Sequence, residues 1–139
     1  MALNLIMLGP PGAGKGTQAE RLSARLRVPH IATGDLFREH LRQATPLGTM
    51  AKTFMDRGEL VPDAIVLRVV REQMRDGGLM DDGFVLDGFP RTVAQAEALD
   101  AIASERPLDA VIDLVVPRDL VLSRLSARRV CRDCDCDGE

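Results

Sequence analysis

The sequence of 139 residues lacks the features of several classes of protein. It has no apolar stretch near the roughly 20 residues that a membrane-spanning helix needs, and no basic leader precedes its first short apolar run. Its three cysteines all lie between Cys131 and Cys136, which is not the disulfide framework of a small secreted domain. We therefore expect a protein of the reducing cytoplasm with no membrane partner.

Lysine is scarce, and positive charge is not in excess. Only Lys15 and Lys52 are lysines among the 18 basic residues, and the formal net charge is −3. No sequence-wide basic field therefore favours a nucleic-acid partner, and any anion site must be assembled locally. The other basic residues are arginines, whose planar guanidinium suits phosphate groups, although most of them are expected to lie on solvated helix faces.

Strands and helices are expected to alternate along the chain, which is long enough for one domain with one core. Apolar runs predict strands at 3–8, 30–32, 84–87 and 110–116. Apolar residues at helical spacing predict helices at 15–26, from 33–35 onward, twice within 45–75, and at 92–106 and 117–129. This order is typical of an α/β fold with an open parallel sheet, helices on both faces, and ligands at the carboxyl ends of the strands.

Residues 9–17, GPPGAGKGT, follow the first predicted strand and open the first predicted helix. The spacing from Gly9 to Gly14 and Lys15 is the Walker A pattern, in which backbone N–H groups form a nest for phosphate oxygens. The helix N-terminus adds its dipole, and Lys15 adds a mobile charge for the β- and γ-phosphates. A glycine turn without a ligand is the alternative, but the strand and helix on either side favour a phosphate-binding loop. The residues expected to bind nucleotide phosphates are Gly12, Ala13, Gly14, Lys15, Gly16 and Thr17.

Four stretches together resemble adenylate kinase, a nucleoside monophosphate kinase. They are 9–17 (GPPGAGKGT), 33–38 (TGDLFR), 87–91 (DGFPR) and 124–129 (RLSARR), within a resemblance that covers residues 1 to about 134. The general P-loop motif has Ser or Thr directly after the lysine, whereas this sequence has Gly16 and then Thr17, as the family does. The resemblance implies a P-loop NTPase-like kinase core at 1–129, within which 33–75 form a small helical AMP-binding insertion.

The reaction that the resemblance implies is reversible phosphoryl transfer, in which Mg·ATP and AMP give two ADP and so serve adenine nucleotide homeostasis. Its loose transition state spreads negative charge over the equatorial oxygens, so that alignment and charge stabilisation supply most of the catalysis. The many arginines suit such a reaction, which needs no activated nucleophile. His30 is expected to be a strand-end residue rather than a catalyst.

The resemblance assigns charged residues to the two nucleotides. Arg38 and Arg91 match the arginines that hold the AMP phosphate, because a planar fork fixes orientation. Asp87 matches the residue that orients Mg²⁺ through water, since this ion keeps much of its hydration shell. Arg124 is expected to stack on the donor adenine, and Arg128 to reach the donor phosphates. The expected catalytic residues are Lys15, Arg38, Arg91 and Arg128.

The resemblance also implies an acceptor pocket. Thr33 resembles the residue of AMP-selective members, whereas kinases for pyrimidine monophosphates tend to carry a small residue there. Gln95 matches a glutamine that contacts adenine, because an amide can both donate and accept hydrogen bonds. The alternative for Gln95 is a capping box, since Thr92 and Gln95 have the spacing of one. The expected AMP-binding residues are Thr33, Gly34, Arg38, Glu59, Leu60, Val61, Gly88, Arg91 and Gln95.

Residues 130–139 depart from the family pattern and are expected to be a truncated remnant of the lid. In the family a lid with two further catalytic arginines leads into a fifth strand and a closing helix, which have no counterpart in this sequence. Cys131 and Cys134 resemble the first half of a zinc-binding lid, but structural zinc needs four ligands in a closed tetrahedron. An unpaired tail is therefore favoured over a zinc site.

These departures carry two further expectations. The strand at 110–116 would lie at an unprotected sheet edge, which predicts self-association or poor solubility. Loss of the lid arginines is expected to lower turnover by about 10³-fold or more, with less effect on AMP affinity. The alternative functions are a truncated nucleotide-binding core with little or no turnover, a kinase for a pyrimidine monophosphate, and a structural zinc module.

Overall fold

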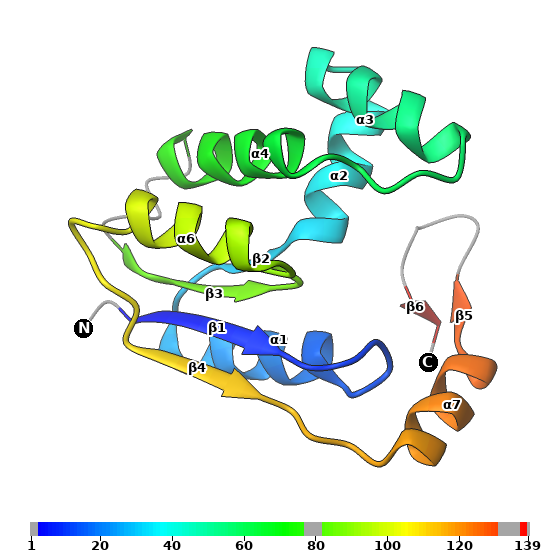
Figure 1. The fold of residues 1–139 in the computed structure, drawn as a ribbon. Helices are drawn as coiled ribbons and strands as arrows, with labels where there is room; N and C mark the ends of the chain where they lie inside the picture. The colour runs from blue at the N-terminus through cyan, green and yellow to red at the C-terminus, as the bar shows by residue number, and fades with distance from the viewer. Residues whose placement is uncertain (1–2, 77–81, 131–136, 139) are drawn as a thin grey trace.

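The computed structural model describes residues 3–76, 82–130 and 137–138, in which strands and helices alternate (Figure 1). The elements in chain order are β1 (Asn4–Leu8), α1 (Lys15–Leu26), β2 (His30–Ala32), α2 (Thr33–Arg42), α3 (Pro46–Asp56), α4 (Asp63–Asp76), β3 (Phe84–Asp87), α6 (Val93–Ile102), β4 (Ala110–Asp113), α7 (Arg118–Ala127), β5 (Arg129–Val130) and β6 (Asp137–Gly138). None of the described helices combines the length and the apolar character that crossing a membrane requires.

Four parallel strands form the main sheet of the described residues, in the order β2-β3-β1-β4. Met7 of β1 pairs with Asp87 of β3, and Ala32 of β2 pairs with the same Asp87. On the other side of β1, Leu8 pairs with Asp113 of β4. The carboxyl ends of the strands therefore meet at one edge, and the predicted open parallel sheet is confirmed.

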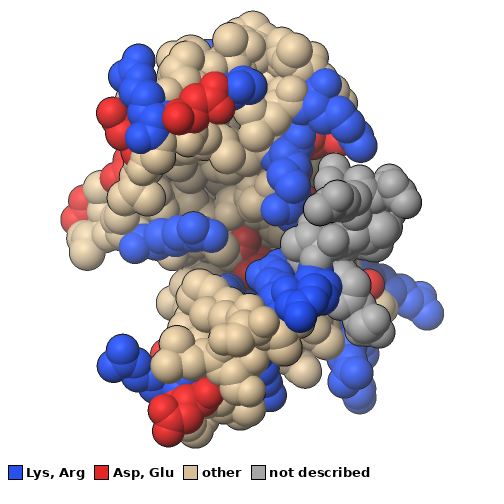
Figure 2. Space-filling view, turned by 90° about the vertical axis from the view of Figure 1, so that its right-hand side faces the viewer, with Lys and Arg blue, Asp and Glu red and all other residues tan. Residues whose placement is uncertain are grey.

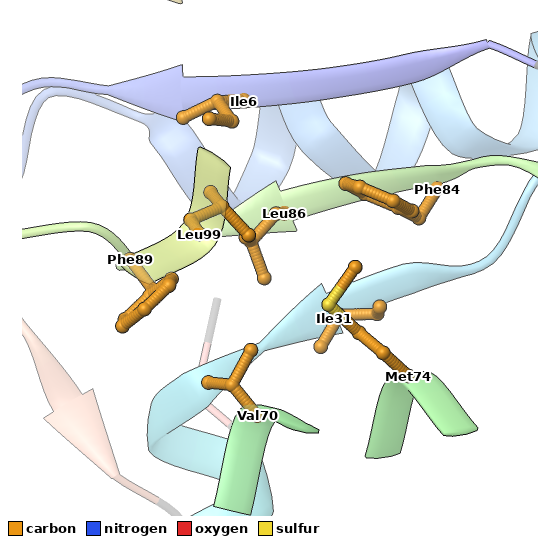
Figure 3. Packing of buried hydrophobic residues seen from close by; sticks show 8 residues of the cluster. All are labelled: Ile6, Ile31, Val70, Met74, Phe84, Leu86, Phe89 and Leu99. Carbon is orange, nitrogen blue, oxygen red and sulfur yellow. The ribbon is translucent and has the colours of Figure 1, made fainter. Parts of the chain in front are cut away.

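Helices cover both faces of the sheet, as the sequence predicted. Alternate residues of a strand point to opposite faces. Phe84 and Leu86 of β3 accordingly belong to the cluster that packs against α4 and α6, whereas Val85 belongs to the cluster beneath α1. Figure 3 shows the first cluster, with Val70 and Met74 reaching from α4 toward the strands. The sheet is thus held between two apolar layers, which fixes its carboxyl edge in place.

Helices α2, α3 and α4 follow one another without a strand and lie beside the sheet (Figure 1). Thr45 caps α3 by accepting a hydrogen bond of 3.0 Å from Gly48 N, and Pro46 takes the first helical position, where a missing N–H costs little. Gly58, with φ of 71°, follows the end of α3. The sequence predicted two helices within 45–75, and α3 and α4 confirm them, while the division of the chain at 33–75 stays a prediction.

Three predicted elements end earlier than expected. β4 ends at Asp113 instead of 116, because its neighbour β1 ends at Leu8; after the hydrogen bond of 2.9 Å from Leu114 N to Leu8 O there is no strand left to pair with. Helix α6 ends at Ile102 instead of 106, because Ala103, with φ of −87° and ψ of 12°, leaves the helical conformation. Helix α7 ends at Ala127, because Arg128 adopts an extended conformation.

Candidate functional site

The loop at 9–14 leaves the end of β1 and leads into the N-terminus of α1. Gly12 and Gly14 have φ of 80° and 94°, in the left-handed region that glycine adopts without strain. Gly14 is the N-cap of α1, and no side chain caps the first N–H groups of the helix. The side chain of Lys15 folds back along the loop, with Cγ 3.4 Å from the place of a Cβ at Gly9. An anion on this loop would meet backbone N–H groups, a helix dipole and an ammonium group.

Asp87, the last residue of β3, lies beside this loop. Its Oδ2 is 3.8 Å from the place of a Cβ at Gly16, in the first turn of α1, and 12% of its side chain is exposed. One carboxylate next to a phosphate-binding loop fits Mg²⁺, which takes one or two carboxylates together with water and phosphate oxygens. Among the residues that the structure describes, no three His, Cys, Asp or Glu side chains form a cage for a metal ion. A magnesium ion here would therefore depend on nucleotide oxygens.

The zinc site considered at Cys131 and Cys134 lies outside the described residues. The search of the described part of the chain finds no group of ligands that could hold zinc.

His30 lies next to Asp87, a proximity that the sequence did not reveal. It begins β2, as expected of a strand-end residue, and its Nε2 is 3.4 Å from Asp87 Oδ2. The nitrogen is buried and has no hydrogen-bond partner among the residues that the structure describes. The two residues meet because β2 pairs with β3, a contact between distant parts of the sequence for which no local pattern exists.

Thr33, Gly88 and Arg91 come together at the ends of β2 and β3. Thr33 Oγ1 donates to the Asp87 carbonyl across 3.5 Å, and Arg91 Nε donates to the Gly88 carbonyl across 2.8 Å. Gly88 has φ of 83°, and a Cβ there would lie 2.8 Å from Thr33 Oγ1 and 3.3 Å from Arg91 Nη2. Only glycine fits between these two side chains, so the structure groups three of the predicted AMP-binding residues.

Arg38 and Gly34 are neighbours on α2. The Arg38 guanidinium is exposed, forms an ion pair with Asp35, and lies 3.6 Å from the place of a Cβ at Gly34. An ion pair between two exposed side chains contributes little to stability. An anionic ligand can therefore replace Asp35 as the partner of this guanidinium. Residues 59–61 lie in the connection between α3 and α4, where the side chain of Leu60 is 93% exposed. Glu59 and Leu60 are exposed and Val61 is half-buried, and their backbone contacts with AMP stay a prediction.

The face toward which the strands point is hollowed. Figure 2 shows this face, with a hollow between an upper and a lower part of the molecule and Lys and Arg side chains on both sides of the hollow. The upper part carries the helices α2 and α3, and the lower part carries α7 (Figure 1). Basic side chains around a concave surface attract anionic ligands.

Gln95, on α6, is buried and has partners for both ends of its amide. Thr92 Oγ1 accepts from Gln95 N over 3.2 Å, which confirms the helix cap at Thr92. The side chain of Gln95 reaches one residue farther back than a capping box requires, because its Oε1 accepts from Arg91 N over 2.8 Å. Its Nε2 donates to Asp63 Oδ1, 2.7 Å away on α4. The contact with adenine stays a prediction, and Asp63 is a neighbour that the sequence did not reveal.

Helix α7 places an arginine on the phosphate-binding loop. Arg124 Nη1 donates to the carbonyls of Gly12 and Ala13 over 3.4 and 3.3 Å. A Cβ at Gly12 would lie 3.1 Å from Leu125, so α7 packs closely on the loop. Arg128 is an exposed residue at the end of the same helix. Arg124 thus contacts the loop that is predicted to bind the donor phosphates, while the roles of Arg124 and Arg128 stay predictions.

Comparisons with known proteins agree with this arrangement. The family model described as adenylate kinase matches residues 7–137. The adenylate kinase of Moorella thermoacetica is 55% identical over 134 residues, which cover 95% of this chain and 61% of the relative. The adenylate kinases of Archaeoglobus fulgidus and of a Geobacillus species are 53% and 51% identical over 134 residues. The chain thus spans 61–62% of the length of these relatives.

Proposed function

The chain belongs to the adenylate kinase family, and from this we propose that it binds ATP and AMP and transfers a phosphoryl group between them to give two ADP. The observation that supports the proposal is the carboxyl edge of the sheet. There the loop at 9–17 lies beside the side chain of Asp87, and the backbone carbonyl of Asp87 accepts a hydrogen bond from Thr33. In this proposal the loop is the place for the donor, and the side of Thr33 is the place for the acceptor. The activity would serve the balance of adenine nucleotides in the cytoplasm.

The donor phosphates would bind to the loop at 9–17 and to Lys15. Arg124 donates hydrogen bonds to the carbonyls of Gly12 and Ala13 in this loop, and from there it would stack on the adenine of the donor. Arg128 would contact the donor phosphates. Asp87 would hold Mg²⁺ through water. A bound Mg²⁺ neutralises charge on the phosphoryl oxygens.

The acceptor would bind on the side of Thr33. Arg91 and Arg38 would hold its phosphate with planar forks, which orient the phosphate for in-line transfer. Thr33 donates a hydrogen bond to the Asp87 carbonyl, and Gln95 would meet the base. We infer that AMP is preferred to CMP and UMP, because Thr33 resembles the residue of AMP-selective members, whereas kinases for pyrimidine monophosphates tend to carry a small residue there.

Lys15 provides the test of the proposal, since Lys52 offers a matched control. Lys52 is exposed on α3 and pairs with Asp56 over 2.6 Å. We expect Lys15→Ala to lower ADP formation from Mg·ATP and AMP by about 10²-fold or more, and Lys52→Ala to leave the rate unchanged. A chain that forms no ADP and binds neither nucleotide in calorimetry would refute the proposal.

A second candidate for these 139 residues is nucleotide binding with little or no turnover. It is favoured by the length of the relatives, of which the chain covers 61–62%. Calorimetry and an ADP assay on the same preparation separate the two candidates. Binding of AMP and ATP together with ADP formation supports the kinase, whereas binding without product supports the second candidate.

A further inference from the structure

The amide of Gln95 is held by two hydrogen bonds from different parts of the chain. Gln95 is 4% exposed, its Oε1 accepts from Arg91 N at 2.8 Å, and its Nε2 donates to Asp63 Oδ1 at 2.7 Å. The other carboxylate oxygen of Asp63 accepts from Thr92 Oγ1 at 3.3 Å. Asp63 is the first residue of α4, so it connects this helix with the start of α6.

These partners permit only one orientation of the amide. An ionised carboxylate can only accept hydrogen bonds, and a backbone N–H can only donate. Rotation of the amide by 180° would place its NH₂ group against Arg91 N and its oxygen against Asp63, leaving buried polar groups unpaired. The orientation of a glutamine amide is assigned from such a network, and here both partners require the same assignment.

The fixed amide has one hydrogen-bonding position left at each end: the second N–H of Nε2 and the second lone pair of Oε1. The edge of adenine offers the complementary pair, an acceptor at N1 and a donor at the 6-amino group. Hypoxanthine carries a donor at N1 and a 6-oxo acceptor in the same places. A 6-oxopurine would therefore need the opposite orientation of the amide, which Asp63 and Arg91 N oppose.

We propose that Asp63 is a positioning residue that fixes the orientation of the Gln95 amide and thereby makes the acceptor site selective for 6-aminopurine over 6-oxopurine nucleotides. The inference rests on the proposed function, because it takes Gln95 as the residue that meets the base of the acceptor. A purely structural role of Asp63 at the N-terminus of α4 would affect all acceptor nucleotides equally. Base selectivity distinguishes the two roles.

The test is the substitution Asp63→Asn, which keeps the shape of the side chain but lets it either donate or accept. Calorimetry with the 139-residue chain measures the dissociation constants of AMP and IMP, which differ at N1 and at position 6 of the base. We expect the wild-type chain to prefer AMP by about tenfold to a hundredfold. Asp63→Asn should reduce this preference by about tenfold, since only the hydrogen bond from Arg91 N then opposes rotation of the Gln95 amide.

Three further variants complete the experiment. Asp100→Asn makes the same change at an exposed residue of α6 and should keep the wild-type preference. Gln95→Ala should lose the preference for AMP over IMP. The double variant with Gln95→Ala and Asp63→Asn should show the same loss as Gln95→Ala alone, as expected of two residues that act together. Asp63→Ser, whose hydroxyl can also donate or accept, replaces Asp63→Asn if circular dichroism shows that the latter does not fold.

The outcomes separate this inference from the proposed function. If the wild-type chain binds AMP and prefers it to IMP, and the Asp63 variant keeps that preference, the inference is wrong while the proposed function stands, even if both affinities fall. A wild-type chain that binds AMP and IMP equally well also overturns the inference alone. A wild-type chain that binds neither nucleotide overturns the proposed function and, with it, this inference.

Discussion

Gly88 separates two of the side chains expected to contact the acceptor. With φ of 83° it adopts a left-handed conformation, and a Cβ would lie 2.8 Å from Thr33 Oγ1 and 3.3 Å from Arg91 Nη2. The motif at 87–91 marked this glycine as part of the site. The sequence did not reveal that it lies close to Thr33, because Thr33 begins α2 after β2 whereas Gly88 follows β3.

We expect Gly88→Ala to destabilise the fold and to weaken AMP binding. The left-handed backbone costs a residue with a Cβ about 1–3 kcal/mol, and the new methyl group must displace Thr33 or Arg91. Urea unfolding should show the loss of stability, and calorimetry should show AMP affinity reduced by about tenfold. The affinity for ATP, which is expected on the loop at 9–17, should change less.

Gly58→Ala is the matched control for the strain in the backbone. Gly58 has φ of 71°, but a Cβ there would have no neighbour within 4 Å. The difference in unfolding free energy between the two variants therefore isolates the contact with Thr33 and Arg91. If Gly88→Ala lost no more stability than Gly58→Ala and bound AMP like the wild type, the crowding at Gly88 would be refuted.

Gln95 illustrates how far single residues could be predicted. Two interpretations were open from the sequence, a capping box and a contact with the base. The cap at Thr92 is formed, but the amide of Gln95 accepts from Arg91 N and not from Thr92 N. The partner of the amide is Asp63, which is 32 positions away. Hydrogen bonds within one helical turn follow from spacing, whereas a bond between the starts of two helices depends on how the helices pack.

At the scale of elements, α2 and α3 approach each other at a glycine. Gly48 is buried in α3, and a Cβ there would collide with the backbone of His40 near the end of α2. Thr45 links the two helices, because His40 Nδ1 lies 2.7 Å from its Oγ1 and Thr45 N donates to the His40 carbonyl over 3.1 Å. The close crossing therefore requires a residue without a side chain.

Gly48→Ala should destabilise the fold, although alanine is normally the better helix former by about 1 kcal/mol. The added methyl group forces α3 away from α2, and overpacking of this kind costs about 1–3 kcal/mol. Thermal and urea unfolding measure the change.

Thr49→Ala provides the comparison on the same helix, since Thr49 is exposed. It should stay within about 0.5 kcal/mol of the wild type. A Gly48→Ala chain as stable as the wild type would show that α2 and α3 are not packed as closely as the structure indicates.

The boundaries of the elements could be predicted where local chemistry decides them. The apolar run at 84–87 is the strand β3 at the predicted residues, and the helix α3 follows the cap and proline at Thr45 and Pro46. The strand predicted at 110–116 was too long. Residues 114–116 are apolar and so continue the pattern of a strand, but the neighbouring strand β1 has already ended at that point. A strand needs a neighbour to pair with, and that neighbour is not encoded in the run itself.

At the scale of the whole molecule, alternating strands and helices were enough to predict a parallel sheet with helices on both faces. The strand order β2-β3-β1-β4 was not predicted. This order places His30 beside Asp87 and Thr33 beside Gly88. The site was therefore predictable as a set of motifs, while its geometry depends on contacts between distant segments.

The outer edge of β4 leads to a prediction about association. Within the described residues β4 pairs with β1 alone, and the side chains of Val111 and Val115 are 54% and 88% exposed. An apolar sheet edge pairs readily with another chain. We expect the 139-residue chain by itself to form dimers or larger species in light scattering, and Val111→Lys to shift it toward monomer. A wild-type chain that stays monomeric at high concentration would contradict this.

The central claim is that two nucleotides bind at the carboxyl edge of the sheet, one on the loop at 9–17 and one beside Thr33, Gly88 and Arg91. Titration of the isotope-labelled chain with ATP and with AMP, followed residue by residue through backbone amide NMR signals, tests it most directly. The account predicts that ATP shifts the signals of 12–17 most strongly and that AMP shifts those of Thr33, Gly88 and Arg91. Shifts by both nucleotides at a common surface away from these residues, or no shifts at millimolar nucleotide, would contradict it.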